Sequence, residues 1–220
     1  MSEWLSEFGP ILLEGTWQSI IMTVAGTFFA YVIGLPVGVW FHVTTPSGLR
    51  PNRVVNTILG WIINIGRSIP FIILMVAMFP LTRLIVGTVV GTAASVVPLV
   101  IAAFPFVARL AESSLREVNP NVIEMAQSMG ASPLQIIVKV LIPESVPSLI
   151  SNATIAVTTI LGYSAMSGII GGGGLGKIAI NYGYYRYKYL IMVAAVVLLI
   201  ALVQVFQSVG TRLASNADKR

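Results

Sequence analysis

Residues 189–211 of the chain read YLIMVAAVVLLIALVQVFQSVGT and contain no Asp, Glu, Lys or Arg. A helix needs about 20 mainly apolar residues to cross the roughly 30 Å hydrocarbon core of a bilayer. This stretch meets that requirement without a single charge. It therefore predicts a transmembrane helix, and it sets the fold class that the rest of the chain has to match.

Four more stretches of comparable length occur in the chain. Residues 15–41, 84–108 and 145–176 carry no charge, and residues 54–82 are interrupted only by Arg67. Together the five stretches predict an all-α integral membrane protein with about five transmembrane helices and no large soluble domain. Gly and Pro inside several spans favour a bundle around a path over a simple anchor.

The composition of the whole chain agrees with a membrane protein. Hydrophobic residues make up 56% of the 220 residues and charged residues 10%, against about a quarter charged in an average soluble protein. The sequence has no Cys and one His, which excludes disulfides and thiolate metal sites and argues against a histidine-based site. The net charge of +5 fits membrane orientation better than nucleic-acid binding, because the basic residues flank the spans.

An odd number of spans places the two termini on opposite sides of the membrane. With the N-terminus outside, eight basic residues fall inside and four outside. The positive-inside rule therefore predicts an external N-terminus and a cytoplasmic C-terminus. The inside residues are Arg50, Arg53, Arg109, Arg116, Lys139, Arg212, Lys219 and Arg220, and the outside ones are Arg83, Lys177, Arg186 and Lys188.

The segment between the third and fourth spans, residues 119–147, reads NPNVIEMAQSMGASPLQIIVKVLIPESVP. Asn119 predicts the start of a short helix, and Gly130 is placed to end it. Ser132 predicts the start of a second helix, which the prolines from Pro143 onward are expected to close before the fourth span. The segment is thus expected to form a cytoplasmic helix–turn–helix whose exposed face suits docking.

Part of this segment resembles a known motif. Glu124-Met125-Ala126, Gly130 and Val140-Leu141-Ile142-Pro143 follow the spacing of the EAA loop, EAA-x3-G-x9-I-x-L-P, of ABC-importer permease subunits. The chain departs from that pattern conservatively, at Met125, Val140 and Ile142. The resemblance implies a type I ABC-importer permease whose loop docks in a groove of a separate ATPase subunit. The implied ATPase-coupling residues are Glu124, Met125, Ala126, Gly130, Val140, Ile142 and Pro143.

Further segments are most similar to the permease subunit of methionine importers. They are RSIPFIIL at 67–74, VGT at 86–88, LGYSAM at 161–166 and GGGGLG at 171–176. The resemblance implies import of D- and L-methionine across a bacterial inner membrane by a homodimer, with two cytoplasmic ATPase subunits and an extracytoplasmic substrate-binding protein. It also implies an extracytoplasmic segment 1–15, a permease domain 16–207 with its coupling loop at 109–147, and a cytoplasmic tail 208–220.

Two places in the spans are candidates for the translocation path or its gate. Tyr163 and Met166 are three residues apart and share a helical face next to Ser164, so that they favour either a gate at a dimer axis or ordinary packing. Arg67 is a charge inside a span, and such a charge usually faces a bundle interior or water. If the span begins later, Arg67 instead extends to the inner interface.

Residues 171–178, GGGGLGKI, are similar to a phosphate-binding loop, but Ile178 replaces the hydroxyl residue that binds Mg²⁺. We interpret the segment as a flexible turn, expect no enzyme, cofactor or metal site, and assign ATP hydrolysis to a partner. The tyrosines at 182–189 predict a membrane-interface belt or contact with a binding protein. The alternative functions are a stand-alone secondary transporter and a membrane assembly protein. A secondary transporter usually needs an intramembrane carboxylate for ion coupling, whereas the acidic residues of this chain lie outside the expected spans or at their ends. The second alternative has no cluster of catalytic residues to support it.

Overall fold

The structure, a computed structural model, describes residues 2–218, and every regular element in this range is helical. Four of the described helices are long and apolar enough to span a membrane, and one bent helix pair brings the number of spans to five. The expected all-α membrane fold is confirmed. Lys219 and Arg220, which entered the charge comparison, lie outside the described residues, as does Met1.

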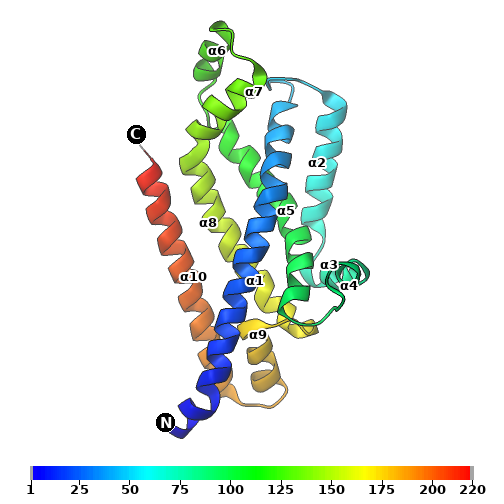
Figure 1. Ribbon diagram of the computed structural model, residues 1–220, viewed down its shortest axis with the longest axis vertical. Helices are drawn as coiled ribbons and strands as arrows, with labels where there is room; N and C mark the ends of the chain where they lie inside the picture. Colours follow the sequence, from blue (N-terminus) through cyan, green and yellow to red (C-terminus); the bar gives the residue numbers. More distant parts are fainter. Residues whose placement is uncertain (1, 219–220) are drawn as a thin grey trace.

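The long helices stand side by side in an elongated bundle (Figure 1). They are α1 (Ser2–Val43), α5 (Thr92–Arg116), α8 (Ile142–Ser167) and α10 (Tyr189–Ala217). The shorter helices are α2 (Arg53–Ser68), α3 (Phe71–Ala77), α4 (Phe79–Val86), α6 (Pro120–Ser128), α7 (Pro133–Ile136) and α9 (Gly174–Ile178), with π-helical stretches at Ile137–Leu141 and Ala179–Tyr184 and a 3-10 turn at Gly168–Ile170. The helices α6 and α7 cap the end at which the C-terminus lies, whereas α9 and the N-terminus lie at the other end.

Helix α1 is the element against which much of the bundle packs, and small residues bring it close to α5. A Cβ atom at Gly34 would lie 2.8 Å from the carbonyl oxygen of Phe104, and one at Gly38 would lie 2.4 Å from the carbonyl oxygen of Ala108. Small residues four positions apart allow membrane helices to approach this closely. These glycines therefore serve helix packing.

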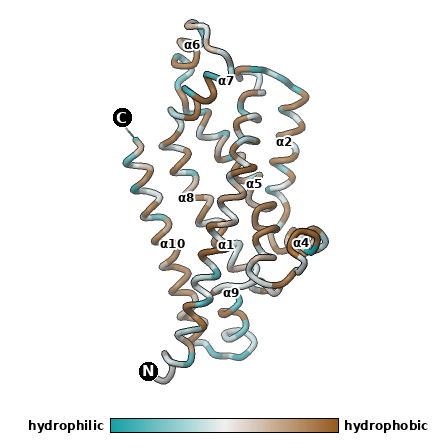
Figure 2. Tube along the Cα trace, viewed as in Figure 1, coloured by the Kyte–Doolittle hydropathy of each residue, from teal (hydrophilic) through white to brown (hydrophobic). Residues whose placement is uncertain are grey.

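The core of the bundle is formed by α1, α3, α5 and α8. Its buried members are all apolar: Met22, Ala30, Phe71, Met75, Leu99, Ala103, Val107, Ala156 and Ile160. Hydrophobic residues dominate the middle of the long helices, and hydrophilic residues gather in the connections at both ends (Figure 2). This distribution matches a bundle whose middle lies in hydrocarbon and whose ends are wet.

The second expected span, 54–82, is not one straight helix. Helices α2 and α3 meet at an angle of 104°, and Ile69 between them is extended, with φ −83° and ψ 123°. Pro70 explains the break, because a proline disfavours the helical conformation in the residue before it. In Figure 1, α3 and α4 lie across the bundle and not along it.

The third expected span, 84–108, has the wrong boundaries, since the helix runs from Thr92 to Arg116. Gly87 (φ +81°) and Gly91 (φ +101°) adopt a conformation that favours glycine and separate α4 from α5. The helix continues past 108 because its charges are paired. Glu112 is fully buried and forms ion pairs with two arginines on the same helix. Glu112 is therefore a buried carboxylate that lies near the C-terminal end of α5.

The prolines from Pro143 onward do not close the second loop helix, contrary to the sequence-based expectation. Helix α7 continues through the π-helical stretch Ile137–Leu141 directly into α8. A proline removes one backbone donor and crowds the carbonyl four residues earlier. The wider π turn just before Pro143 changes the hydrogen-bond pattern there and lets the chain remain helical. One helical run therefore extends from Pro133 to Ser167.

The packing of α1 against α5 can be tested at Gly38. We expect Gly38→Leu to destabilise the protein by about 1–3 kcal/mol, because the added side chain overpacks the interface. Thermal unfolding in detergent should show a midpoint lowered by about 5 °C. Gly9→Leu is the matched control, since a Cβ atom at Gly9 has no neighbour within 4 Å. Equal midpoints for the two variants would contradict this account of the interface.

Candidate functional site

The helix–turn–helix at one end of the bundle is built by local capping. The side chain of Asn119 accepts a hydrogen bond from the Asn121 amide at 3.0 Å and starts α6. Gly130 has φ +77°, and the Ala131 amide donates to the Ala126 carbonyl oxygen at 3.1 Å. This is a helix end in which a left-handed glycine turns the chain away. The expected roles of Asn119 and Gly130 are confirmed.

The second short helix begins with a complete capping box. The Gln135 amide donates to the Ser132 hydroxyl, and the Ser132 amide donates to the Gln135 side chain at 2.8 Å. In a capping box, two backbone N–H groups that have no partner within the helix each donate to a side chain. Ser132 therefore begins α7 as the sequence predicts, and the turn between α6 and α7 is fixed on both sides.

Large apolar side chains protrude from this element away from the bundle. Met125 is 60% exposed, Met129 82% and Leu134 70%, and Glu124 is exposed beside them. The element lies at the end of the molecule, beyond the apolar middle of the long helices (Figure 2). A patch of apolar side chains that is exposed at the polar end of the bundle indicates a contact surface for another protein.

The remaining residues of the motif lie on the far side of the turn. Val140 and Ile142 are half-buried and Pro143 is exposed, so that they belong to the root of the element and not to its tip. Leu141 between them is fully buried and packs with Leu115 and Val118. Sequence reasoning missed this anchor, because the motif leaves its position unspecified. The buried side chain fastens the helix–turn–helix to the end of α5.

The candidate gate residues on α8 lie on two faces of the helix, one packed against the bundle and one open. The Tyr163 ring stacks on Phe71 with centroids 4.8 Å apart. Ser164 is fully buried and its hydroxyl donates to the Leu161 carbonyl oxygen at 2.8 Å, which makes it a packing residue within this chain. Met166 is 43% exposed. Met166 therefore lies on an open face of α8, whereas Ser164 lies on its packed face.

Gly162 shares the open face of α8 with Met166. A Cβ atom added at Gly162 would meet nothing within 4 Å, and the two residues are one helical turn apart. The sequence alone did not single out Gly162. The signal that could have distinguished it is the spacing of four residues to Met166.

Arg67 lies in the last turn of α2, at the 104° bend. Because α2 begins at Arg53, Arg67 is about 20 Å along the helix. Asn64 is exposed and lies about one turn from Arg67 on the helix surface. Within the described chain Arg67 has no ion-pair partner. The sequence alone did not single out Asn64 beside Arg67. Two exposed polar side chains on one face of the helix indicate contact with water or a polar ligand.

The glycine-rich segment 171–176 is not a flexible turn, which corrects our interpretation of the sequence. It is buried apart from the half-buried Gly171. The Gly174 amide donates to Gln18 Oε1 at 2.8 Å, and the Leu175 amide donates to Ser19 Oγ at 2.9 Å. In a phosphate-binding loop such amides point at the ligand. Here two of them are bonded to α1, so that the segment packs as a structural element.

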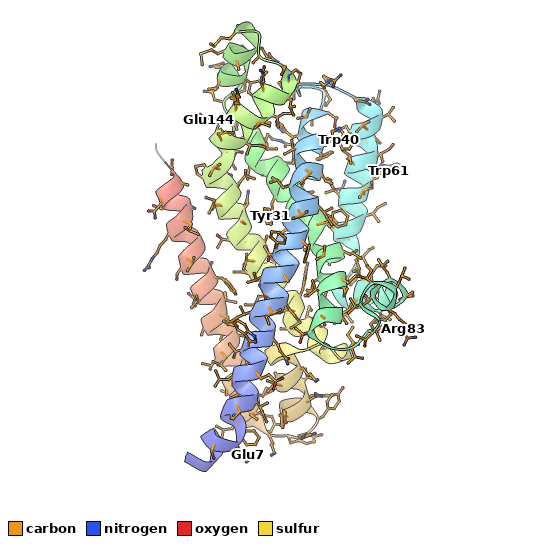
Figure 3. All side chains as sticks on the ribbon, viewed as in Figure 1. Glu7, Tyr31, Trp40, Trp61, Arg83 and Glu144 are labelled. Carbon is orange, nitrogen blue, oxygen red and sulfur yellow. The ribbon has the colours of Figure 1, made fainter. Side chains whose placement is uncertain are left out.

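Aromatic and basic side chains gather at the opposite end from α6. Arg186 lies 4.9 Å from the centroid of the Tyr182 ring, and Lys188 lies 4.7 Å from that of Phe8. Lys188 is also 3.9 Å from Glu7, which Figure 3 labels near the N-terminus. These contacts join the last loop to the start of α1. They are compatible with an interface belt and with a contact for a binding protein.

Comparison with known proteins places this geometry in a family. The family model for the binding-protein-dependent transport system inner membrane component matches residues 34–217. The probable D-methionine transport system permease protein of Vibrio cholerae is 50% identical over 220 residues, covering 100% of this chain and 98% of that one. The D-methionine transport system permease protein of Escherichia coli is 49% identical over 158 residues, or 72% of this chain and 73% of that one.

Solved structures agree with the sequence relatives. A chain of the MetNI methionine ABC transporter in an inward-facing conformation superimposes with a TM-score of 0.95 at 45% identity, covering 97% of this chain and 99% of that one. An amino acid ABC transporter chain at 20% identity has a TM-score of 0.69 over 96% and 94% of the two chains, and shares the fold. The chain belongs to the family of inner membrane components of binding-protein-dependent transport systems.

Proposed function

We propose that this inner membrane component imports methionine, as the D or the L enantiomer, with energy from ATP hydrolysed by a separate subunit. The support for methionine is the identity of 50% over the whole chain to a probable D-methionine permease and the similarity of the fold to a methionine transporter. The chain itself acts as a permease subunit and not as an ATPase. In support, two amides of its glycine-rich loop are bonded to α1.

The proposed assembly has two copies of the chain around a central path, two ATPase subunits and an extracytoplasmic binding protein. A single bundle with about five spans is small for enclosing a path, which favours a dimer. The end with α6 and α7 faces the cytoplasm, so that the N-terminus is outside. In this arrangement the permease domain is 16–207, the external segment is 1–15 and the cytoplasmic tail is 208–220.

The observation that carries this proposal is the continuous helix from the docking element to the open face of α8. It runs from Pro133 through Leu141 to Met166 without a break, a length of about 50 Å. A continuous helix can pass a displacement from one end to the other. Closure of the ATPase subunits would therefore move the candidate gate by moving α7.

The coupling residues have two proposed roles. Glu124, Met125 and Ala126 on α6 enter the ATPase groove, and Gly130 turns the chain so that α6 can present them. Val140, Ile142 and Pro143 form the root that passes the movement to α8. The support is the exposed fraction of Met125, 60%, against the half-buried Val140 and Ile142.

The proposed path residues lie on two open helix faces. On α8 they are Met166 and Gly162, with Tyr163 holding α3 by its stack on Phe71. On α2 they are Arg67 and Asn64, whose polar side chains are exposed inside a membrane-spanning region. Polar groups at this depth usually face a path and not lipid. Ser164 has no part in this proposal, because it is buried within the chain.

Reconstitution with the partner ATPase tests the proposed function and the docking role of Gly130 together. The parent protein should import labelled methionine into proteoliposomes in an ATP-dependent way. Gly130→Leu should reduce uptake about tenfold, because a left-handed conformation costs a non-glycine residue about 1 kcal/mol or more and the side chain enters the docking surface. Gly130→Asn is the control, since Asn tolerates this conformation. Normal uptake by the Leu variant would remove the docking assignment.

Gly162 provides a test of the open face of α8. Gly162→Phe should fold and bind the ATPase normally, because its Cβ position is free within the chain, yet block methionine uptake by filling the path. Gly9→Phe, whose Cβ position is equally free, should transport normally. Detergent size-exclusion chromatography and uptake are measured for both. Full transport by Gly162→Phe would place the path elsewhere.

The polar face of α2 can be probed by cysteine chemistry, because the chain has no cysteine. Asn64→Cys and Arg67→Cys should react with a membrane-impermeant thiol reagent in the assembled transporter. Ile62→Cys, on the opposite apolar face of the same helix, should react at least about tenfold more slowly in the low-dielectric lipid environment. Equal rates at positions 62, 64 and 67 would mean that α2 has no face lining a path.

A further inference from the structure

An apolar groove with a volume of about 510 Å³ lies between α2 and α5. No charged, hydroxyl or amide side chain is present among the described residues that line it. On the α5 side the wall is formed by Ile101, Phe104 and Pro105. The α2 side includes Ile58, Trp61, Ile62 and Ile65, which recur at the spacing of one helix face.

The bend after α2 closes one end of this groove. Helix α3 lies across the bundle (Figure 1), and its residues Leu74 and Ala77 line the groove. Near the bend the two walls touch, since a Cβ atom at Gly66 would lie 2.6 Å from Cγ of Pro105. The groove is therefore a preformed slot between three helices.

The groove lies in a part of the chain that spans the membrane. Helices α2 and α3 form the bent span, and α5 is a span of its own. Trp61, which Figure 3 labels, is 68% exposed, and Ile65 is 59% exposed. Exposed apolar side chains at this depth meet the hydrocarbon tails of lipids. Asn64 and Arg67 are not part of the lining, so that the groove and the proposed path use different faces of α2.

A positive charge lies beside the other end of the groove. Arg109 follows Pro105 by one turn of α5, and its side chain is 41% exposed. Its guanidinium carbon lies 5.9 Å from the centroid of the Phe41 ring, and a Cβ atom at Gly60 would lie 3.4 Å from the same ring. Arg109 is therefore level with the part of α2 around Gly60, away from the end that α3 closes.

The carboxylate next to Arg109 does not cancel the positive charge there. Glu112 pairs with Arg109 at 3.2 Å and also with Arg116, so that one carboxylate serves two guanidinium groups. Arg53 at the start of α2 is exposed and adds another positive charge. No Asp or Glu occurs in residues 15–111. Arginine side chains can lay their stems on apolar surface and extend the charged group to the level of the lipid headgroups.

We propose that this groove binds an anionic phospholipid from the leaflet on the α6 and α7 side of the membrane. One acyl chain lies between α2 and α5 and ends against α3, and the phosphate group lies at Arg109 and Arg53. Basic groups between transmembrane helices favour anionic headgroups in this way. A zwitterionic lipid has the same tails but no net charge. The bound chain would contact both sides of the bend that positions Arg67.

The test places the assembled transporter in phosphatidylcholine nanodiscs that contain a small fraction of a photoactivatable lipid. This lipid is either phosphatidylglycerol or phosphatidylcholine, with the same diazirine-bearing acyl chain, and the crosslinked residues are identified by mass spectrometry. The phosphatidylglycerol probe should label residues 58–69 and 101–105 about tenfold more than the phosphatidylcholine probe.

Two pairs of variants separate the headgroup from the tail. Arg109→Gln should reduce labelling by phosphatidylglycerol about fivefold, whereas Arg109→Lys, which keeps the charge, and Arg83→Gln, which removes an exposed arginine outside the lining, should not. Ala77→Trp should abolish labelling by filling the groove. Val76→Trp is its control, because Val76 is exposed but does not line the groove. Ile65→Phe narrows the groove from α2 and replaces Ala77→Trp if that variant aggregates in size-exclusion chromatography.

Three results would overturn the proposal. In the first, both probes label the groove equally, which means that it selects no headgroup. In the second, labelling survives both Ala77→Trp and Ile65→Phe. In the third, lipid labels the groove in the isolated chain but not in the assembled transporter, which means that another subunit covers it. None of these measurements uses methionine uptake, so that their outcome is independent of the proposed function.

Discussion

Close contact between α1 and α5 is the interaction on which the rest of the bundle depends. In hydrocarbon, apolar side chains gain little by meeting each other, because lipid tails are equally apolar. Tight packing must therefore come from shape, and Gly34 and Gly38 allow the backbones of the two helices to meet. The same helix, α1, holds the glycine-rich segment through Gln18 and Ser19. One helix thus organises both the middle of the molecule and the end at which α9 lies.

The second organising feature is the unbroken helix that begins at Pro133. Local chemistry fixes its first turn through the capping box of Ser132, and Leu141 fastens it to the end of α5. Beyond that anchor the helix reaches Met166 without an interruption. A contact made at α6 or α7 can therefore change the position of residues deep in the bundle. This continuity links the docking surface to the proposed path.

The short loop helices could be predicted because caps depend on neighbouring residues. Asn119, Gly130 and Ser132 act through backbone groups that lie within a few positions of them. Pro143 was predicted wrongly to end a helix, because the π turn that accommodates it involves a hydrogen-bond pattern which the sequence does not announce. Ser164 was likewise placed beside a path from its position in the sequence, although its buried side faces the core.

The sequence by itself determined the membrane class, the approximate number of spans, the helix–turn–helix and the family resemblance, since length, hydrophobicity and capping are properties of consecutive residues. Only the tertiary structure decided that α5 extends to Arg116, that residues 172–176 are buried, that Asn64 and Arg67 are exposed on α2, and that Gly162 and Met166 lie on an open face of α8. The physical reason is that these features need partners far away in the chain. The Gly174 amide finds its acceptor on Gln18, 156 residues earlier, and no local pattern records such a pair.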